Sequence, residues 1–489
     1  MIETAGSLGE AWTWRKAAQQ RGAISVMFAL MMLILLGFIG MSLDLGRVYN
    51  RAMELQAVAN VAALAAARQL NGTPAGVSNA LKQAAYAVGA LKYQYHQQAV
   101  SWDNSALSFS ATASGSWIDA AAAQAAPDGL LFARADTSKL AAPLGTIDLM
   151  FMRMLSPALA STSTSAKAVA GRSTINVAPL AVCAMGNAAA AKRSNPGPPP
   201  VDELVEYGYR RGVSYDLMQL NPNGSTPSNF IIDPFAPPGI IGAASNTAPA
   251  VAGPYVCTGQ LAMPRISGAA ISVSQPFPLA SLFQQFNSRF DQYPGALCSY
   301  ATAPPDSNIK SYLYSTAIPW MAAVPGGQGA LSSSTGGALW TVADPLPAPA
   351  GNTAPMYGPL WSYARAVQYS PTQPAGGYVP LATGAWATLY KPGAPTAVGT
   401  YLAGGSTPYQ AVNGATFQAP PAAHQGVANR RVLNVALLSC PVGAGRTTAT
   451  VLGIGKFFMT VPATASSLDA EFAGLVQEQS LGGAVVLYP

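Results

Sequence analysis

The side chains that most often build catalytic or metal sites are scarce in this chain. Its 489 residues include only two histidines and four cysteines: His96, His424, Cys183, Cys257, Cys298 and Cys440. The cysteines are far apart and form no C-x-x-C pair, so the usual spacing of zinc ligands is missing. We therefore expect no bound metal and no cofactor.

The sequence also gives little support for a hydrolase. A Ser-His-Asp triad would have to use one of the two histidines, and the chain has no G-x-S-x-G sequence to present a nucleophilic serine. Residues 442–447 (VGAGRT) resemble a phosphate-binding loop, but its lysine and its spacing are missing, so we interpret them as a turn between two strands. Two of the 20 acidic residues could meet as a carboxylate pair, yet no pattern selects one. We therefore expect that the protein is not an enzyme.

The cysteines are better interpreted as structural. In an oxidising compartment an even number of cysteines indicates disulfides, and four cysteines allow three connectivities. A bond between Cys257 and Cys298 would close a local loop, and on spacing we favour that pair. The alternative is that some of the cysteines are buried free thiols.

The element around which the rest must be organised is a long helix predicted for residues 22–70. Residues 23–43 carry no charge, and these 21 residues are enough to cross the roughly 30 Å of a bilayer's hydrocarbon core. After Asp44, apolar and small residues recur at steps of three and four up to Leu70, where the sequence NGTP stops the pattern. We predict one continuous helix of about 48 residues, about 70 Å long. A cleaved signal peptide, the alternative, would have a shorter apolar core followed by a cleavage site with small residues.

Charge and composition agree with an anchored, exported chain. Arg15, Lys16 and Arg21 precede the apolar segment, whereas Arg47 and Arg51 follow it, which favours a cytoplasmic N-terminus by a small margin. No second segment of transmembrane length follows, so we expect a single-pass protein. Charged residues make up only 9% of the chain and the net charge of +6 is dispersed, which gives no basic surface for nucleic acid.

The sequence of residues 22–70 resembles the N-terminal segment of TadG-like proteins of the tight-adherence (Flp) pilus assembly system. A basic residue and a glycine, an apolar span, an Asp-x-Gly pair and an E-L-Q before an alanine-rich helix carry the resemblance: Arg21, Gly22, Asp44, Gly46, Glu54, Leu55 and Gln56. One departure is the sequence ANV at 59–61, where many family members have Ala-Asp-Ala.

This resemblance implies a location and a set of partners. Members of the family are bacterial inner-membrane proteins with most of the chain in the periplasm, which agrees with the charge bias. It implies that the partners are the membrane and other pilus assembly proteins, with homo- or hetero-oligomers formed through the N-terminal helix. Small residues in the alanine-rich part would allow close approach of a neighbouring helix.

Beyond the membrane segment we expect an α+β protein rich in turns, because Gly and Pro are abundant. The predicted divisions are a cytoplasmic N-terminus (1–22), the transmembrane helix (23–43), a helical stalk with a small pilin-like α/β region (44–155), a linker (156–172) and a periplasmic domain (173–489). Within the stalk region, residues 77–91 are predicted to be a second helix, 107–117 a half-exposed strand and 147–155 a short amphipathic helix.

In the last domain the continuous apolar runs 173–183 and 431–440 predict central, partly parallel strands covered on both faces of a mixed sheet. Between them, about 184–430 is interpreted as a loop-rich insertion, with 202–220 as a charged surface element. Many TadG-like proteins carry a von Willebrand factor A-like domain here, and a degenerate form of it would place Cys183 beside Cys440, which suggests a disulfide. Its metal-binding Asp-x-Ser-x-Ser is absent, so no metal site is inferred.

Two functions remain after these exclusions. The first is a membrane-anchored, pilin-like structural or assembly component of a Flp-type pilus. The alternative is a membrane-tethered periplasmic binding or sensing protein without a role in the pilus.

Overall fold

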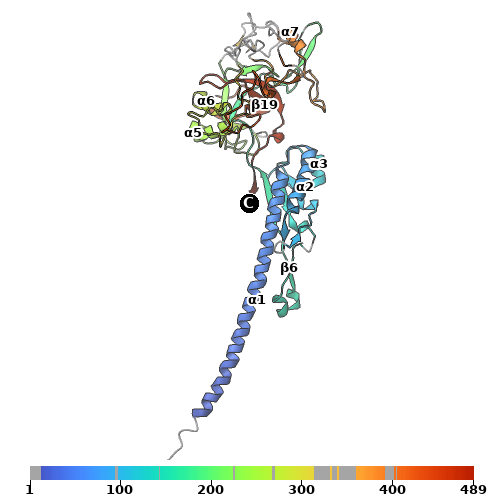
Figure 1. The fold of residues 1–489 in the computed structure, drawn as a ribbon, viewed down its shortest axis with the longest axis vertical. Coiled ribbons are helices and arrows are strands. Elements are labelled where there is room, and N and C mark those ends of the chain that lie inside the picture. Colours follow the sequence, from blue (N-terminus) through green and yellow to red (C-terminus); the bar gives the residue numbers. More distant parts are fainter. Residues whose placement is uncertain are drawn as a thin grey trace, which may run out of the picture. The chain divides into compact units, whose positions relative to one another are not determined.

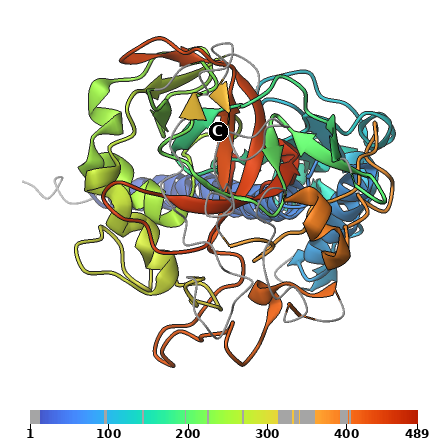
Figure 2. The ribbon, with the colours of Figure 1, turned by 90° about the horizontal axis from the view of Figure 1, so that it is seen from above.

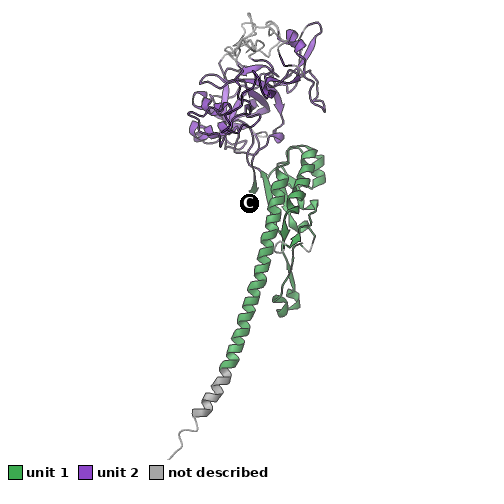
Figure 3. Cartoon of the chain, in the orientation of Figure 1, with its two compact units in different colours: residues 1–171, 486–489 green, residues 172–485 purple. Residues whose placement is uncertain are grey.

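The computed structural model divides the chain into two compact units. It describes residues 13–93, 97–141, 144–195, 197–223, 226–266, 270–312, 331–332, 339–340, 359–390, 401–402 and 405–489, with side chains from residue 24 onward except in 331–340. Unit 1 comprises residues 1–171 and 486–489, and unit 2 comprises residues 172–485 (Figures 1 and 3). The boundary lies close to the predicted start of the last domain at 173, but the C-terminal residues 486–489 return to unit 1.

Unit 1 is built on one helix, α1 (Thr13–Ala67), which is continuous as predicted and begins before the predicted residue 22. From residue 24 to residue 43 every side chain is exposed except at Gly40. An apolar surface on all sides of a helix is stable only in lipid or inside another protein. Within the described residues α1 is the one helix that is long and apolar enough to span a membrane.

The second half of α1 forms the core of unit 1. It packs against α2 (Pro74–Gly89) and strand β4 (Phe132–Asp136). Ala59, Ala62, Ala63 and Ala66 are fully buried in this contact, because methyl side chains let the neighbouring backbones approach closely. The alanine-rich face predicted for partner helices is therefore occupied by the unit's own elements.

A four-stranded sheet completes the unit, in the order β21-β7-β4-β3. β4 is antiparallel to both β3 and β7, and Tyr488 of β21 packs edge-on against Phe132 at 5.1 Å between ring centroids. The remaining bounds are β1 (Lys92–Tyr93), β2 (Gln98–Ala99), β3 (Leu107–Ser110), α3 (Ala120–Ala125), β7 (Lys167–Arg172) and β21 (Val485–Tyr488).

Two predictions for this region were wrong. Residues 147–155, predicted to be one amphipathic helix, form the end of strand β5 (Thr146–Asp148) and the short helix α4 (Met152–Leu155). The predicted linker 156–172 contains β6 (Ser161–Ser163), which pairs with β5, and β7 in the middle of the sheet. A low-complexity Ser/Thr/Ala composition is compatible with a strand once a partner strand offers its hydrogen bonds.

Unit 2 is organised around an eight-stranded mixed sheet, in the order β12-β20-β19-β17-β8-β13-β14-β18. β8 and β17 are parallel, whereas the other described neighbours are antiparallel. The bounds are β8 (Leu180–Cys183), β12 (Ser214–Asp216), β13 (Asn229–Ile232), β14 (Ile271–Ser274), β17 (Val432–Leu438), β18 (Arg446–Ala449), β19 (Val451–Met459) and β20 (Asp469–Val476).

Hydrophobic clusters cover both faces of this sheet, which explains the uninterrupted apolar runs. Leu180 and Val182 of β8 belong to one cluster, and their neighbours Ala181 and Cys183 belong to the other. Figure 2 shows the red C-terminal strands crossing the middle of the unit, with the yellow-green helices α5 (Pro249–Thr258) and α6 (Leu279–Asn287) to one side. The prediction of central, partly parallel strands is confirmed for β8 and β17.

The interpretation of 184–430 as an insertion needs correction, because this segment supplies β12, β13 and β14 to the main sheet. Only one described strand pair is parallel, so the sheet is dominated by antiparallel pairs and gives no support to a von Willebrand A-like domain. The segment also contains β9 (Ala191–Asn195), β10 (Val201–Glu206), β11 (Tyr209–Arg210), β15 (Leu331–Ser332), β16 (Leu339–Trp340) and α7 (Trp386–Leu389).

The charged segment 202–220 is not a surface element. Arg210 and Glu203 form a fully buried ion pair at 2.7 Å, and Arg210 also donates to the Leu389 carbonyl. Paired and hydrogen-bonded in this way, the two charges can be accommodated in the core, whereas removing either partner would leave the other uncompensated. Composition alone therefore misplaced the segment.

Candidate functional site

The charged residue at the end of the apolar span, Asp44, is buried and hydrogen-bonded to the backbone of a distant segment. It is 1% exposed, and its carboxylate accepts hydrogen bonds from the backbone N–H groups of Met150 (2.9 Å), Phe151 (2.8 Å) and Met152 (2.8 Å). These groups open helix α4, whose own N-cap residue Phe151 provides no side-chain cap. Asp44 therefore caps a helix that lies more than a hundred residues further along the chain.

The cap requires a charged carboxylate. Burial by itself disfavours the ionised form of Asp44, but the three backbone N–H groups of Met152, Met150 and Phe151 and the positive charge of Arg47 outweigh it, so the pKa of Asp44 is lowered. The carboxylate is therefore ionised at neutral pH. Its charge also complements the positive end of the α4 backbone dipole.

About one helical turn before Asp44 on α1, the Phe151 side chain covers Gly40. A Cβ atom added to Gly40 would lie 2.7 Å from Phe151 ring atoms, so only glycine leaves room for the ring on this face of α1. Gly40 is also the one described position between 24 and 43 that is not exposed. The chain segment between β5 and β6 thus reaches alongside the last turns of the predicted membrane span, as Figure 1 shows near the label β6.

Further along α1, Arg51 joins the helix to two other segments. It donates to the Leu144 carbonyl at 2.7 Å, pairs with Glu54 at 3.3 Å and lies over the Tyr93 ring at 4.7 Å. Because this side chain is buried, its contacts fix the loop before β5 and strand β1 against the helix.

The E-L-Q residues also contact unit 1 itself. Leu55 is 1% exposed in the core, and Gln56 donates to Asn60 at 2.9 Å and to the Lys167 carbonyl of β7 at 3.1 Å. Asp44 and Gln56 thus bind the hairpin and the sheet to the helix, whereas Glu54 pairs with Arg51 of the same helix. Of the other predicted positions, Gly46 has open space beside it and Gly22 lies outside the residues whose side chains are described.

A small polar cavity of about 280 Å³ lies against this part of α1. Its lining mixes both charges with neutral polar groups: Arg47, Asn50, Arg51, Glu54, Gln97, Thr146, Ile147 and Asp148. Within the described residues the buried Nη1 atom of Arg47 has no hydrogen-bond partner. The cavity can hold water or a small polar group.

The face of α1 that unit 1 leaves free carries a stripe of apolar side chains. Leu45 and Tyr49 are each 67% exposed and Met53 is 54% exposed, and the three positions are four residues apart. That spacing places them on one side of the helix. We call these three residues the free stripe.

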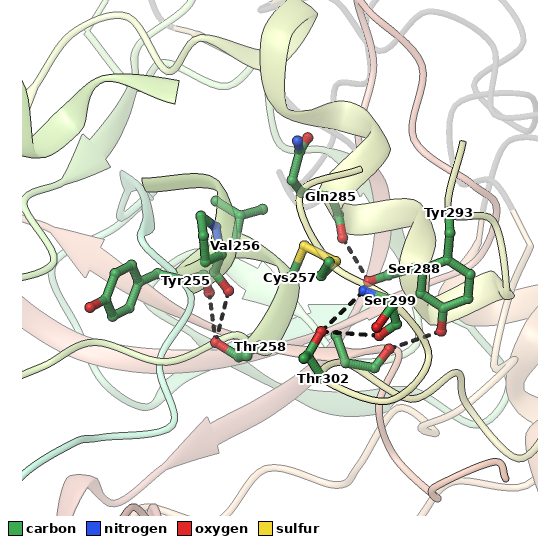
Figure 4. The surroundings of a disulfide bond; sticks show 12 residues. Tyr255, Val256, Cys257, Thr258, Gln285, Ser288, Tyr293, Ser299 and Thr302 are labelled. Carbon is green, nitrogen blue, oxygen red and sulfur yellow. Dashed lines mark hydrogen bonds between the residues drawn. A yellow bond between two sulfur atoms is a disulfide. The ribbon is translucent and has the colours of Figure 1, made fainter. Parts of the chain in front are cut away.

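Both disulfides lie in unit 2. Cys183 of β8 is bonded to Cys440, which follows the parallel strand β17, with 5.6 Å between their Cα atoms. Cys257 at the end of α5 is bonded to Cys298, with a Cα separation of 6.3 Å (Figure 4). The Cys257–Cys298 bond is the local pair favoured on spacing. The Cys183–Cys440 bond also forms, because β8 and β17 are neighbouring strands although the domain is not von Willebrand A-like.

Side-chain hydroxyl groups around the second disulfide donate to nearby backbone carbonyls. Thr258 donates to the Pro254 carbonyl, Ser288 donates to the Gln285 carbonyl, and Tyr293 donates to the Ala303 carbonyl (Figure 4). These groups close the turns at each end of the bonded segments. The surroundings therefore indicate a structural role for this disulfide.

Of the two histidines, His424 is the one whose contacts the structure describes. His424 is hydrogen-bonded to Asp291 at 2.6 Å and stacks on Tyr300 with 4.0 Å between ring centroids. No serine or cysteine in the described part of the chain hydrogen-bonds to this ring, and the same residues contain no cluster of three metal-ligating side chains. His96 lies outside the described residues.

Residues 22–69 match a family model described as putative Flp pilus-assembly TadE/G-like. Comparison with curated proteins and with solved structures gives no significant match. The matched residues form α1 from the apolar span to the end of the helix, including Asp44, Gly46 and the E-L-Q residues. The chain therefore carries a TadE/G-like N-terminal segment, as the sequence predicted, and this segment supports involvement in Flp pilus assembly.

Proposed function

We propose that this protein is an inner-membrane-anchored, pilin-like structural or assembly component of a tight-adherence pilus. The observation that carries the proposal is the unbroken course of α1, which passes from an exposed apolar span into the packed core of unit 1. A helix that is half lipid-facing and half packed on α2 and an antiparallel sheet is a pilin-like layout. The TadE/G-like match of this helix supports the same assignment.

In this proposal the protein works without catalysis. Asp44, Arg51 and Gln56 tie the hairpin, the loop before it and the sheet to α1, so a displacement of the helix moves unit 1 as a rigid body. Such coupling is what an assembly subunit needs, because a pull on the membrane helix must move the domain outside. The N-terminus is cytoplasmic, and the chain beyond the span, from residue 44 onward, is periplasmic.

The partner surface in this proposal is the free stripe. The alanines that would allow the closest helix approach are buried inside unit 1, whereas Leu45, Tyr49 and Met53 are exposed just beyond the span. Apolar side chains at helical spacing are suited to packing against a neighbouring helix, either of a second copy or of another pilus protein.

Charge placed on the stripe tests the function. In the native host, Leu45→Glu with Tyr49→Glu should leave export and protein level unchanged but abolish pili, counted by electron microscopy. Tyr86→Glu is the matched control, because Tyr86 is 80% exposed on α2 and outside the stripe. Normal piliation in the double variant would refute the proposed surface. Reporters fused after Pro489 that work in only one compartment test the orientation.

A tethered binding or sensing protein is the second candidate, because unit 2 is large and its function is not tied to α1. The charged stripe separates the two, because Leu45→Glu with Tyr49→Glu leaves the span and the packed residues of unit 1 in place. A simple tether without a role in the pilus predicts that piliation is retained in this variant, whereas the assembly role predicts its loss with normal export.

A further inference from the structure

The β5–β6 hairpin ends in a tip, residues 149–160, that exposes large apolar side chains. Met150 is 62% exposed, Met154 82% and Leu155 69%, and the smaller exposed fractions of Phe151 (42%) and Leu159 (40%) add to the same surface. A cluster of this kind on so short a segment needs a partner, because contiguous exposed apolar surface is unfavourable in water.

The hydrogen bonds and contacts of the tip fix its level along α1. Phe151 covers Gly40, and the backbone of Met150–Met152 is bound to Asp44. Gly40 lies three residues inside the apolar segment 23–43, about 4.5 Å below its end at the rise of an α-helix. The apolar side chains of the tip therefore lie beside the last turns of the membrane span.

The backbone of the tip is suited to a low-dielectric environment. The N–H groups that begin α4 are bonded to Asp44, and the Ser156 hydroxyl accepts from the Ala158 N–H at the start of the following turn. Satisfied backbone groups are the main requirement for burial near lipid. The tip contains no acidic residue, and its one charge, Arg153, is exposed and has the length to reach lipid phosphates.

We propose that this tip inserts into the boundary between headgroups and acyl chains of the bilayer that holds α1, as a second membrane contact. Lipid is the partner of this apolar surface, because the tip lies beside the end of the apolar span and its only charge is positive. Two separate contacts with one bilayer restrain the depth of unit 1 and its tilt relative to the membrane plane more than a single helix does. The inference rests on the proposed membrane anchor.

Spin labelling of the full chain in lipid nanodiscs tests this. All four native cysteines are in disulfides, so the single substitution Met154→Cys creates the one labelling thiol. The label should collide often with oxygen, which concentrates in lipid, and rarely with a water-soluble nickel chelate. A label at Tyr86→Cys, on the exposed face of α2 in the same unit, should show the reverse.

Each alternative outcome is distinguishable. Frequent nickel collisions at position 154, equal to those at position 86, would overturn the proposal. A label shielded from both oxygen and the nickel chelate would also overturn the proposal if the shielding is lost when the lipid-to-protein ratio is raised. Such a result indicates that a second protein molecule, rather than lipid, covers the tip. If the unlabelled chain fails to float with liposomes on a density gradient, the proposed anchor is wrong and the proposal for the tip is overturned with it.

Discussion

Asp44 shows how one side chain can satisfy two requirements at the end of the apolar span. A carboxylate at this level needs compensation, and the first backbone N–H groups of α4 need acceptors. The carboxylate accepts the hydrogen bonds of the N–H groups, and these groups compensate its negative charge. The result is a cap formed between segments more than a hundred residues apart, which positions the hairpin on the helix.

Replacing Asp44 should release the tip without unfolding unit 1. Asp44→Ala removes a cap worth about 1 kcal/mol and leaves three N–H groups without their acceptor. Hydrogen exchange followed by mass spectrometry should speed up at residues 150–152 and remain unchanged in α2 and β4. Asp148→Asn, an exposed acid in the adjoining strand, is the control and should leave exchange at the tip unaltered.

The same cap predicts a pH dependence. The pKa of Asp44 is lowered in the folded protein, so its stabilising contribution is present above the unfolded value of 3.8 and is lost as the pH falls through the lower folded value. Protection of residues 150–152 should therefore hold at pH 5 and decline only below about pH 3.8. A decline already between pH 7 and pH 5 would contradict the ionised cap.

In unit 2 we expect the opposite pH dependence of folding stability. There Asp469 of β20 lies directly across from Asp216 of β12. Burial and the neighbouring Asp216 raise the pKa of Asp469 to about 7. The folded protein therefore retains a proton that the unfolded chain releases near pH 4, so stability falls as the pH rises from about 4 to about 7. Burial likewise raises the pKa of Glu471 to about 7, which adds to this fall.

Asp469→Asn should stabilise unit 2 at pH 8 by about 1 kcal/mol, since the amide removes a like charge facing Asp216. At pH 4 the variant and the wild type should unfold at nearly the same temperature in calorimetry. Asp202→Asn is the contrast, because hydrogen bonds from Ser194 and Lys192 lower the pKa of Asp202 and the substitution removes the negative charge that pairs with Lys192. A variant less stable than the wild type at pH 8 would show that Asp469 is needed as a carboxylate.

At the scale of elements, the alanine-rich half of α1 is an internal surface. Ala62→Leu should destabilise unit 1 by about 1–3 kcal/mol, because the site is fully buried against neighbouring elements and has no room for a larger side chain. Ala57→Leu on the exposed side of the same helix is the control, as both residues favour helix. Equal unfolding temperatures for the two variants would show that the alanine face is not the packed one.

Local patterns predicted the elements that depend on local sequence. Helix α1 follows from its apolar and small residues, and helix α2 from the Pro74 start and its spacing of small residues. The partners of Asp44 could not be predicted, because they depend on the hairpin folding back along the helix. The tip was mistaken for a helix for the same reason, since the pairing of β5 with β6 is set by residues beyond the segment.

The burial of the Glu203–Arg210 ion pair also depends on residues far along the chain, so the local sequence does not predict it. Nothing in the sequence around Glu203 and Arg210 distinguishes a solvated pair from one in the core, since the carbonyl of Leu389 that completes the arrangement lies far along the chain. The free stripe was missed because alanine content, rather than exposure, guided the choice of a partner face. Exposure of a helix face is decided by the elements that cover the opposite one.

For the whole molecule, the two units have separate cores and different means of stabilisation. Unit 1 is held by α1 and its packing, whereas unit 2 contains both disulfides and a sheet with two buried faces. The two units should therefore unfold in separate transitions, and conditions that break disulfides should affect only one of them.

Removing each disulfide tests this division. The bond between Cys183 and Cys440 closes a loop of 257 residues and that between Cys257 and Cys298 a loop of 41. On chain entropy the first stabilises by about 5.6 kcal/mol and the second by about 4 kcal/mol. Calorimetry of the full chain should thus show a larger drop of the unit 2 transition for Cys183→Ser with Cys440→Ser than for Cys257→Ser with Cys298→Ser. The unit 1 transition should stay in place in both, because this unit has no cysteine; if it moves with unit 2, the two cores depend on each other and a pull on α1 is transmitted through the whole chain.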